Sequence, residues 1–521
     1  MDEVQSGGAP PIAAAPAANR WLITLAVTVG TLMGAIDTSI VNVALPHIQS
    51  SLGVTITEAT WISTAYLIAL VIIMPLTAWL AGVFGRKRTY MFCLGLFLVA
   101  SFFCGNAATF SWLVIFRALQ GIGAGALQPT EQAILRETFP LEEQGMAMAL
   151  YGIAVMIGPA IGPSLGGWLT ENISWRWIFF INIPIGIAGM LMVWRFVHDP
   201  PYLVRKRVRV DYVGIALLAV GLATLQTVLE QGQTNDWFSS SLIVALSVVA
   251  AVCLTGFVWW ELRTLAPAVD LRLLKIPSFL AGTSIGGVLG LSLFSGMFLL
   301  PLFMQTLLGY TALQSGMALI PRTLAMMAMM PVVGVLFNRL GARKMVASGL
   351  LVAAYAGWMM SHFTTQTSLA QLIIPQIVQG VGFSLIFVAL STSSLALVPR
   401  EKMTNATGMY NLVRQLGGSF GVAIFATLLE KRSQTLHAQF VVYANPYNPA
   451  FQQRIQALQT FYTHAGADVY TAHQRALATV DGIIQQQAAV LSFERLFIIS
   501  VFLLALCVPM VLTLRDRVTR G

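Results

Sequence analysis

Long runs of apolar residues, separated by short polar or glycine-containing stretches, recur along almost the whole chain. A run of about 20 apolar residues is long enough to cross a bilayer as a helix. The pattern predicts fourteen membrane-spanning helices, at residues 21–45, 58–81, 89–106, 111–134, 146–169, 176–197, 212–230, 240–261, 278–308, 314–337, 345–363, 370–397, 404–429 and 491–514. We therefore expect an all-α polytopic membrane protein whose two termini lie on the same side.

The composition excludes a soluble protein. Of the 521 residues 57% are hydrophobic and only 10% are charged, and the mean hydropathy is +0.75, whereas about 25% of the residues of a soluble domain are charged. The four cysteines and six histidines are dispersed without metal-ligand spacing. The sequence therefore predicts neither a metal site nor a cofactor, and the Ala- and Pro-rich residues 1–20 are predicted to be a disordered tail.

A net charge of +9 would suit a nucleic-acid partner, but the positions of the basic residues indicate membrane topology instead. If the N-terminus is cytoplasmic, most of the 30 Lys and Arg residues fall in short inner loops and tails, and the short outer loops hold only Arg176. Inner loops of membrane proteins carry an excess of basic residues. We therefore expect cytoplasmic termini and no nucleic-acid binding.

Two pairs of similar stretches show that the chain contains a repeat. AWLAGVFGRKR (78–88) matches GVLFNRLGARK (334–344), and LQGIGAGA (119–126) matches VQGVGFSL (378–385), in the same order. The predicted organisation is a six-helix half at 21–198, two inserted helices at 211–262 and a second half at 277–515. This second half includes a long periplasmic segment, 430–490, before the last span. Parallel repeats of this kind place a binding site at their interface.

Four motifs carry a family resemblance. A degenerate G-x-L-a-D-R-x-G-R-K loop keeps Gly85, Arg86 and Lys87 but has Ala78, Gly82 and Val83 at other motif positions, and R-x-x-Q-G-x-G is present at Arg117, Gln120, Gly121 and Gly123. Residues 37–46 read DTSIVNVALP, and the fifth span contains an antiporter-like string at Gly152, Gly158, Pro159, Gly162, Pro163, Gly166 and Gly167. Together these motifs resemble the major facilitator superfamily, in its fourteen-span drug:proton antiporter branch of the EmrB/QacA type, closest to EmrB-like exporters.

The resemblance implies a multidrug efflux transporter of the bacterial inner membrane that uses the proton gradient, confers antibiotic resistance and works by alternating access. It also implies a periplasmic membrane-fusion adaptor and an outer-membrane channel as partners. Export of fatty acids or other hydrophobic weak acids is the alternative. A receptor or membrane enzyme is a third class, but the chain has no GxxxxGK[ST], HExxH or GxSxG motif.

Asp37 is the residue that an ordinary membrane span does not explain, because a carboxylate in hydrocarbon costs at least about 2.5–3.5 kcal/mol. At about 1.5 Å per residue, it lies roughly 13 Å from Pro46, and Arg117 lies roughly 9 Å into the fourth span. Both spans line the central cavity in the resembled architecture. We expect Asp37 and Arg117 to couple transport to protons; the alternative is a satisfied buried acid and a fixed structural cation.

Other polar residues within the spans are candidates for the substrate cavity. They are Asn42, Trp61, Tyr66, Gln120, Gln128, Arg322, Gln379, Asn411 and Arg414. Glu131 is either a second acid in the cavity or a side chain that reaches the inner interface.

Two further expectations concern packing. The glycines of the fifth span, four residues apart, form a smooth face that permits close helix approach, and we expect this face to seal the two halves together. In the segment 430–490, residues 449–462 have an amphipathic pattern. The interpretation is a pair of helices that cap the outer mouth or dock a partner; the alternative is a loosely ordered loop.

Overall fold

The computed structural model describes residues 20–199 and 210–514, and this part of the chain consists of helices and connecting turns without a β-strand. The first half contains α1 (Arg20–Leu52), α2 (Ile56–Ala59), α3 (Trp61–Phe84), α4 (Arg86–Gly105), α5 (Phe110–Gly125), α6 (Leu127–Thr138), α7 (Gln144–Asn172), α8 (Trp177–Phe180) and α9 (Asn182–Phe196). Two inserted helices follow, α10 (Tyr212–Gln231) and α11 (Ser241–Arg263). The second half contains α12 (Pro277–Leu307), α13 (Ala312–Ala318), α14 (Ile320–Leu340), α15 (Ala342–Met360), α16 (Leu369–Ser393), α17 (Met403–Val441), α18 (Pro449–His464) and α19 (Val469–Leu506).

The all-α membrane fold predicted from the sequence is confirmed. Thirteen stretches of the described chain are long and apolar enough to cross a membrane. The remaining predicted span, 345–363, corresponds to α15, which packs along α16 and α19. Arg343 and Lys344 in its first turn lower the mean hydropathy of α15. The predicted tail 1–20 lies outside the described residues except for Arg20, which begins α1.

Several helices are longer than the sequence pattern predicted. α1 continues through Pro46 to Leu52, and α17 and α19 extend well beyond the predicted spans 404–429 and 491–514. The apolar run marks only the part of a helix that can be surrounded by lipid, whereas the backbone hydrogen bonds continue into polar sequence. Polar stretches beside a span therefore do not end the helix.

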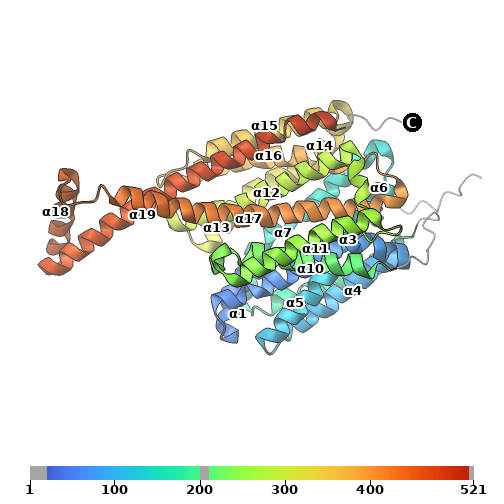
Figure 1. Cartoon of the computed structure of the whole chain (residues 1–521), viewed down its shortest axis with the longest axis horizontal. Coiled ribbons are helices and arrows are strands. Elements are labelled where there is room, and N and C mark those ends of the chain that lie inside the picture. The colour runs from blue at the N-terminus through green and yellow to red at the C-terminus, as the bar shows by residue number, and fades with distance from the viewer. Residues whose placement is uncertain (1–19, 200–209, 515–521) are drawn as a thin grey trace, which may run out of the picture.

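The two halves lie side by side as bundles of roughly parallel helices, with α10 and α11 along one side of them (Figure 1). α10 packs against α3 of the first half and α17 of the second. Arg20 pairs with Glu143 at 2.8 Å, and the Leu514 carbonyl accepts from Arg343 Nε at 2.7 Å. Both ends of the described chain are therefore at one end of the bundle, which we call the basic end because the Arg- and Lys-containing first turns of α4 and α15 lie there.

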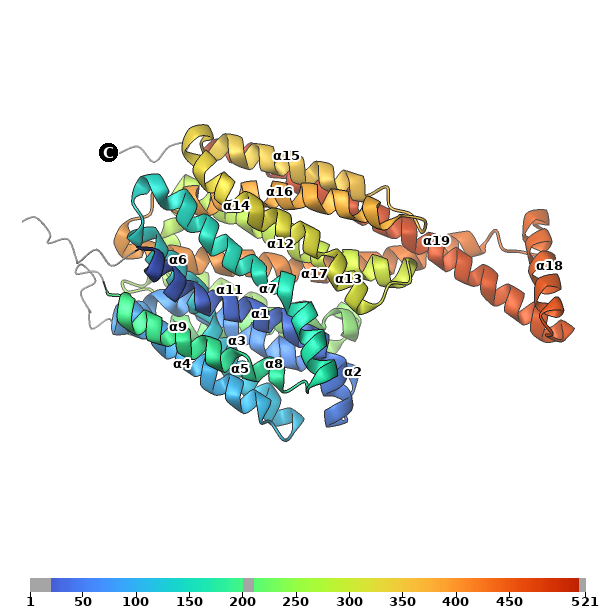
Figure 2. The same ribbon diagram turned by 180° about the vertical axis from the view of Figure 1, so that it is seen from behind.

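The segment 430–490 forms an arm that projects from the opposite end of the bundle (Figures 1 and 2). It consists of the end of α17, α18 and the beginning of α19. The predicted helix at 449–462 is present as α18, which packs against α19. Ile455 of α18 is buried within the arm, and the Tyr462 hydroxyl lies 2.8 Å from Thr479 Oγ1 of α19. The expected cap over the outer mouth is wrong, since both views place α18 far from the bundle. The alternative prediction of a loosely ordered loop is also wrong, because most of this segment is helical.

The glycine face of α7 packs against α1 of the same half. A Cβ atom added at Gly158 would lie 2.2 Å from the carbonyl carbon of Ala35, and one at Gly162 would lie 2.5 Å from Ser39 Cβ. The expectation that this face seals the two halves together is therefore wrong. Small residues permit close helix approach, but helix periodicity does not identify the partner helix.

The halves touch through other glycines, at the basic end. An added Cβ at Gly145 of α7 would lie 2.6 Å from the Gly334 carbonyl of α14, and at Gly152 it would meet the Met330 sulfur at 2.8 Å. Thr407 of α17 donates to the Pro129 carbonyl at 2.9 Å. These contacts join the halves closely at the basic end.

We expect Gly158→Ala to destabilise the protein by about 1–3 kcal/mol or more, because the new methyl group would meet α1 backbone atoms that have no room to move. Thermal unfolding of the purified protein measures this effect. Gly167→Ala is the matched control, since its nearest neighbour is Val43 Cγ1 at 4.0 Å. Equal melting temperatures for the two variants would contradict the packing described here.

Candidate functional site: a buried ion pair in the first half

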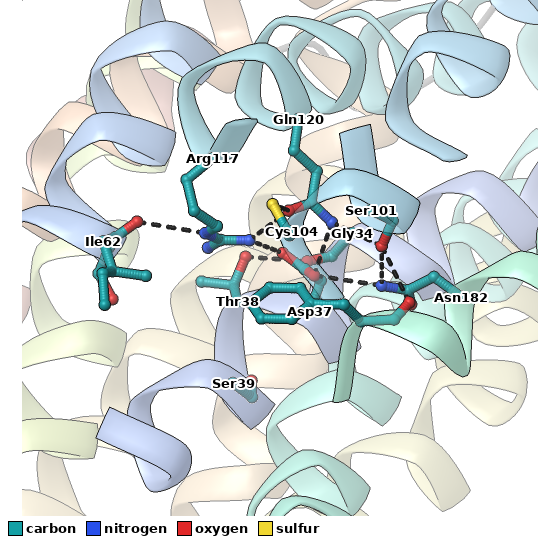
Figure 3. Close-up of polar contacts among 12 residues, drawn as sticks. Gly34, Asp37, Thr38, Ser39, Ile62, Ser101, Cys104, Arg117, Gln120 and Asn182 are labelled. Carbon is teal, nitrogen blue, oxygen red and sulfur yellow. Dashed lines mark hydrogen bonds and ion pairs between the residues drawn. The ribbon is translucent and has the colours of Figure 1, made fainter. Parts of the chain in front are cut away.

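The Asp37 side chain lies inside the first half and is 0% exposed. It is surrounded by residues of α4, α5 and α9 (Figure 3). Its helix, α1, is held on the other side by the glycine face of α7. A carboxylate in this position has no access to solvent, so its charge must be balanced by the protein.

Arg117 supplies that balance. Its Nη1 atom donates to Asp37 Oδ2 at 2.6 Å and to Gln120 Oε1 at 2.7 Å (Figure 3). Arg117 and Gln120 are three residues apart on α5 and therefore share one face of that helix. Gln120 Nε2 donates to Asp37 Oδ1 at 2.9 Å, so the three side chains form a closed ring of hydrogen bonds.

Two residues that the sequence analysis did not select complete the site. Asn182, at the start of α9, donates to Asp37 Oδ1 at 3.2 Å and to Ser101 Oγ at 3.0 Å. Ser101 of α4 also accepts from Gln120 at 3.1 Å and donates to the Phe179 carbonyl at 3.0 Å. Their only signal in the sequence is a polar side chain within an apolar run, which many spans share.

The remainder of the Arg117 guanidinium is enclosed by backbone and aromatic groups. Nε donates to the Ile62 carbonyl at 3.2 Å, and the guanidinium lies 4.3 Å from the centroid of the Tyr66 ring. Aromatic faces attract cations, most strongly where water is excluded. Tyr66, expected to line the substrate cavity, is buried beside the ion pair instead.

The structure thus brings Asp37 and Arg117 into direct contact, but at a different place from the expected one. Both are buried within the first half, among α1, α3, α4, α5 and α9, and not in a space between the halves. Gln120 belongs to the same cluster. The cluster is neutral when Asp37 is ionised, because one carboxylate faces one guanidinium.

Glu131 is a second buried acid in the first half, separate from this cluster. Its side chain is 0% exposed, and Oε1 accepts from Thr28 Oγ1 at 3.0 Å. The alternative that it reaches the inner interface is therefore wrong. Oε2 has no hydrogen-bond partner among the described residues.

Another polar network crosses between the halves. Arg414 Nη2 of α17 donates to Gln128 Oε1 at 3.1 Å and to the Tyr151 hydroxyl at 3.4 Å. Asn411, one turn earlier, donates to Gln132 Oε1 at 2.9 Å and accepts from the Tyr151 hydroxyl at 3.0 Å. Three predicted cavity residues, Gln128, Asn411 and Arg414, are therefore brought together at the interface.

The remaining predicted cavity residues lie in two other places. Arg322 of α14 and Gln379 of α16 meet inside the second half, where Arg322 Nη1 donates to Gln379 Oε1 at 3.4 Å. Asn42 and Trp61 are exposed towards the arm end, and Asn42 Oδ1 accepts from Ser63 Oγ at 3.0 Å.

Removing one partner of the Asp37–Arg117 pair leaves a buried charge unbalanced, which costs about 3–5 kcal/mol. We expect Arg117→Gln to lower the free energy of unfolding by about 3–5 kcal/mol. The double variant Asp37→Asn/Arg117→Gln should regain most of this loss, because it leaves no unbalanced charge. Thermal or denaturant unfolding of the purified protein measures both. Lys402→Gln is the control, since its pair with Asp270 is half-exposed and such pairs contribute about 0–1 kcal/mol. Additive losses in the double variant would contradict the coupling.

Comparison with known proteins agrees with this architecture. The Major Facilitator Superfamily model matches residues 27–422. The multidrug export protein EmrB of Haemophilus influenzae is 35% identical, covering 84% of this chain and 86% of its own. The fatty acid resistance protein FarB of Neisseria gonorrhoeae is 34% identical, covering 96% of this chain and 97% of its own.

The fold has also been seen in solved structures. The human organic anion transporter MFSD10 superposes with a TM-score of 0.60 at 16% identity, covering 94% of this chain and all of that one. At this identity the similarity concerns the fold alone. The predicted resemblance to EmrB-like proteins is confirmed by the sequence relatives. The chain is a multi-pass membrane transporter, not an enzyme, and it belongs to the major facilitator superfamily.

Proposed function

We propose that this transporter exports amphiphilic or hydrophobic compounds from the cytoplasm, driven by the inward proton gradient. The observation that carries the proposal is the ion pair between Asp37 and Arg117, buried in a membrane-spanning half. Ionisable residues at such depth are expensive and are functional by default. The names of the EmrB relatives support export of more than one compound.

Protonation changes the charge of this cluster. With Asp37 ionised the cluster is neutral; with a proton on Asp37 it carries one positive charge, because Arg117 keeps its own. Arg117 would then retain Gln120 and the Ile62 carbonyl as acceptors but lose its ionic partner. A buried unbalanced charge is unfavourable, so protonation favours any rearrangement that hydrates or re-pairs Arg117.

The packing of α7 offers a route from this cluster to the other half. α1 carries Asp37 and is in backbone contact with α7 at Gly158. The same helix α7 contacts α14 of the second half at Gly145. A shift of α1 on protonation would therefore move the helix that closes the basic end. Coupling of this kind requires that α7 has a second packed arrangement, which protonation would favour.

The basic end is the cytoplasmic end in this proposal, because positive residues mark inner loops. The contacts between the halves then close the transporter on its cytoplasmic side. Protons reach Asp37 from the outer side and leave inward after the switch. Glu131, also buried in the first half, is a second acid available to the same process.

A second candidate function is the export of fatty acids or other hydrophobic weak acids. It is favoured by the match to FarB, which extends over nearly the whole chain. It is also favoured by Arg322, a buried cation without an acidic partner among the described residues. The two functions share one transport cycle and differ in the charge of the substrate.

We also propose that the arm docks a periplasmic adaptor that leads to an outer-membrane channel. The arm lies far from the bundle and exposes large side chains, among them Tyr443, Tyr447 and Tyr470. Asp468 caps α19 by accepting from the Tyr470 and Thr471 amides, each at 3.1 Å. Hydrogen bonds from the side chain and backbone of Thr471 lower the pKa of Asp468 below its ordinary value. The capped helix α19 presents Tyr470 in a defined position.

Asp37→Asn is the central test of proton coupling. We expect this variant, reconstituted in proteoliposomes, to lose export driven by a pH gradient, because its side chain cannot exchange a proton. Substrate-dependent dissipation of the gradient measures the coupling directly. Asp481→Asn is the control, since that acid pairs with His437 in the arm. Export by Asp37→Asn at the wild-type rate would rule out this mechanism.

Replacing residues 440–485 by a short Gly/Ser linker tests the arm. We expect export in proteoliposomes to persist, because the arm makes no part of the bundle, while resistance of whole cells to exported compounds falls. Chemical cross-linking of the cell envelope should show an adaptor adduct with the full chain and none with the shortened one. Unchanged resistance and unchanged cross-linking would remove the docking role.

A further inference from the structure

We propose that the second half contains a receptor for the carboxylate head of an exported amphiphile, formed by Arg322 of α14 and Gln379 of α16. The inference rests on the proposed export function and adds the residues that would recognise an acidic substrate. It concerns a site separate from the Asp37 cluster, because the two sites lie in different halves.

Arg322 is a buried cation whose hydrogen-bonding capacity is largely unused. Its side chain is 1% exposed, and its Nη1 contact with Gln379 Oε1 is long, at 3.4 Å. Nε and Nη2 are buried and have no acceptor among the described residues. Leaving buried donors of a charged group unpaired is costly, so an arginine in this state favours binding of an anion.

No carboxylate of the described second half, Glu494 of α19 included, is hydrogen-bonded or ion-paired to Arg322. From α12 to α16 the chain contains no Asp or Glu at all. Glu401 lies before α17 at the basic end, and Glu430 is hydrogen-bonded to Gln233 near the arm end. In the first half, by contrast, Arg117 beside Gln120 is paired with Asp37.

The internal repeat shows how the two halves correspond. Gln379 occupies the place of Gln120 in the repeated motif, and Arg322 occupies the place of Tyr66. Gly158 packs on Ala35 of α1, and its counterpart Gly417 packs on Gly287 of α12.

This register also places Leu289 where the first half has Asp37. The second half therefore keeps the amide and has a guanidinium but lacks the carboxylate. A carboxylate from outside the chain would complete the same set of polar partners.

Open space adjoins the Nη1 atom of Arg322 beside α12. A Cβ atom added at the partly exposed Gly296 would have one neighbour within 4 Å, Arg322 Nη1 at 3.5 Å. Met326 follows Arg322 by one turn on α14 and is part of the apolar core. A flexible thioether one helical turn from the arginine suits a ligand with an acidic head and a variable apolar body.

Arg414 is another buried arginine without an acidic partner among the described residues, as is Arg136, which donates to the Thr392 carbonyl. The surroundings of Arg414 indicate a different role from that of Arg322. It donates to Gln128 and Tyr151 of the first half and so links the two halves. Loss of Arg414 should affect all substrates alike, whereas loss of Arg322 should affect acids selectively. This difference separates recognition from a general structural effect.

The test compares substrates in proteoliposomes under a pH gradient. Cholate, its methyl ester and ethidium are the transported probes, and laurate is a competitor. For Arg322→Gln we expect the KM for cholate and the inhibitory concentration of laurate to rise at least about tenfold, as for a lost hydrogen bond to a charged group. Transport of the ester and of ethidium should stay within about twofold of wild type, and Arg414→Gln should reduce all probes equally. If Arg322→Gln weakens only the inhibition by laurate, the site is one for fatty acids. If it raises only the KM for cholate, the site is one for bulkier acids.

A second variant places the anion inside the protein. Gly296→Asp puts a carboxylate beside Arg322, so we expect loss of cholate transport with ethidium transport retained; Gly296→Asn is the matched neutral control and should keep both. This variant also serves if Arg322→Gln fails to fold. The proposal would be overturned if Arg322→Gln and Gly296→Asp both reduced cholate and ethidium transport equally. It would also be overturned if both variants left cholate transport unchanged. A wild-type protein that exports ethidium but no acid would overturn this inference alone, and one that exports neither would overturn the proposed function.

Discussion

The cost of placing charge in a low-dielectric interior governs the arrangement of the first half. Asp37 is tolerated because Arg117, Gln120 and Asn182, from two other helices, all donate to it. Each of these helices must then lie within hydrogen-bonding distance of α1, which defines how α1, α5 and α9 pack. In the mechanism that we propose, one proton on Asp37 changes the charge of this cluster, so the interaction that orders the first half also makes it respond to protons.

Close packing connects α1 to the second half through α7. α7 uses one set of glycines, including Gly158 and Gly162, to contact α1 in its own half. It uses others, Gly145 and Gly152, to contact α14 in the other half. Two faces of one helix thus join α1, which carries Asp37, to the interface between the halves.

The two halves share an ancestry in sequence but differ in their interior charge. The first half contains a balanced pair, whereas the second contains Arg322 beside Gln379 and no carboxylate in α12 to α16. Duplication preserved the glycines and the glutamine that shape the helices. This difference in charge underlies the two roles that we propose for the halves: the first half exchanges protons, and the second half binds the acidic head of a substrate.

The sequence by itself determined the class of protein, the spans, the repeat and the residues that are out of place in hydrocarbon, because each depends on local composition and helical period. It also placed Asp37 and Arg117 at similar depth. Only the tertiary structure decided that they meet within one half, with Ser101 and Asn182 beside them, since periodicity does not specify which helices are neighbours. For the same reason the partner of the α7 glycine face, the direction of the arm and the burial of Tyr66 were not predictable. Pairing of helices depends on contacts between residues far apart in the chain, and a single sequence carries no record of them.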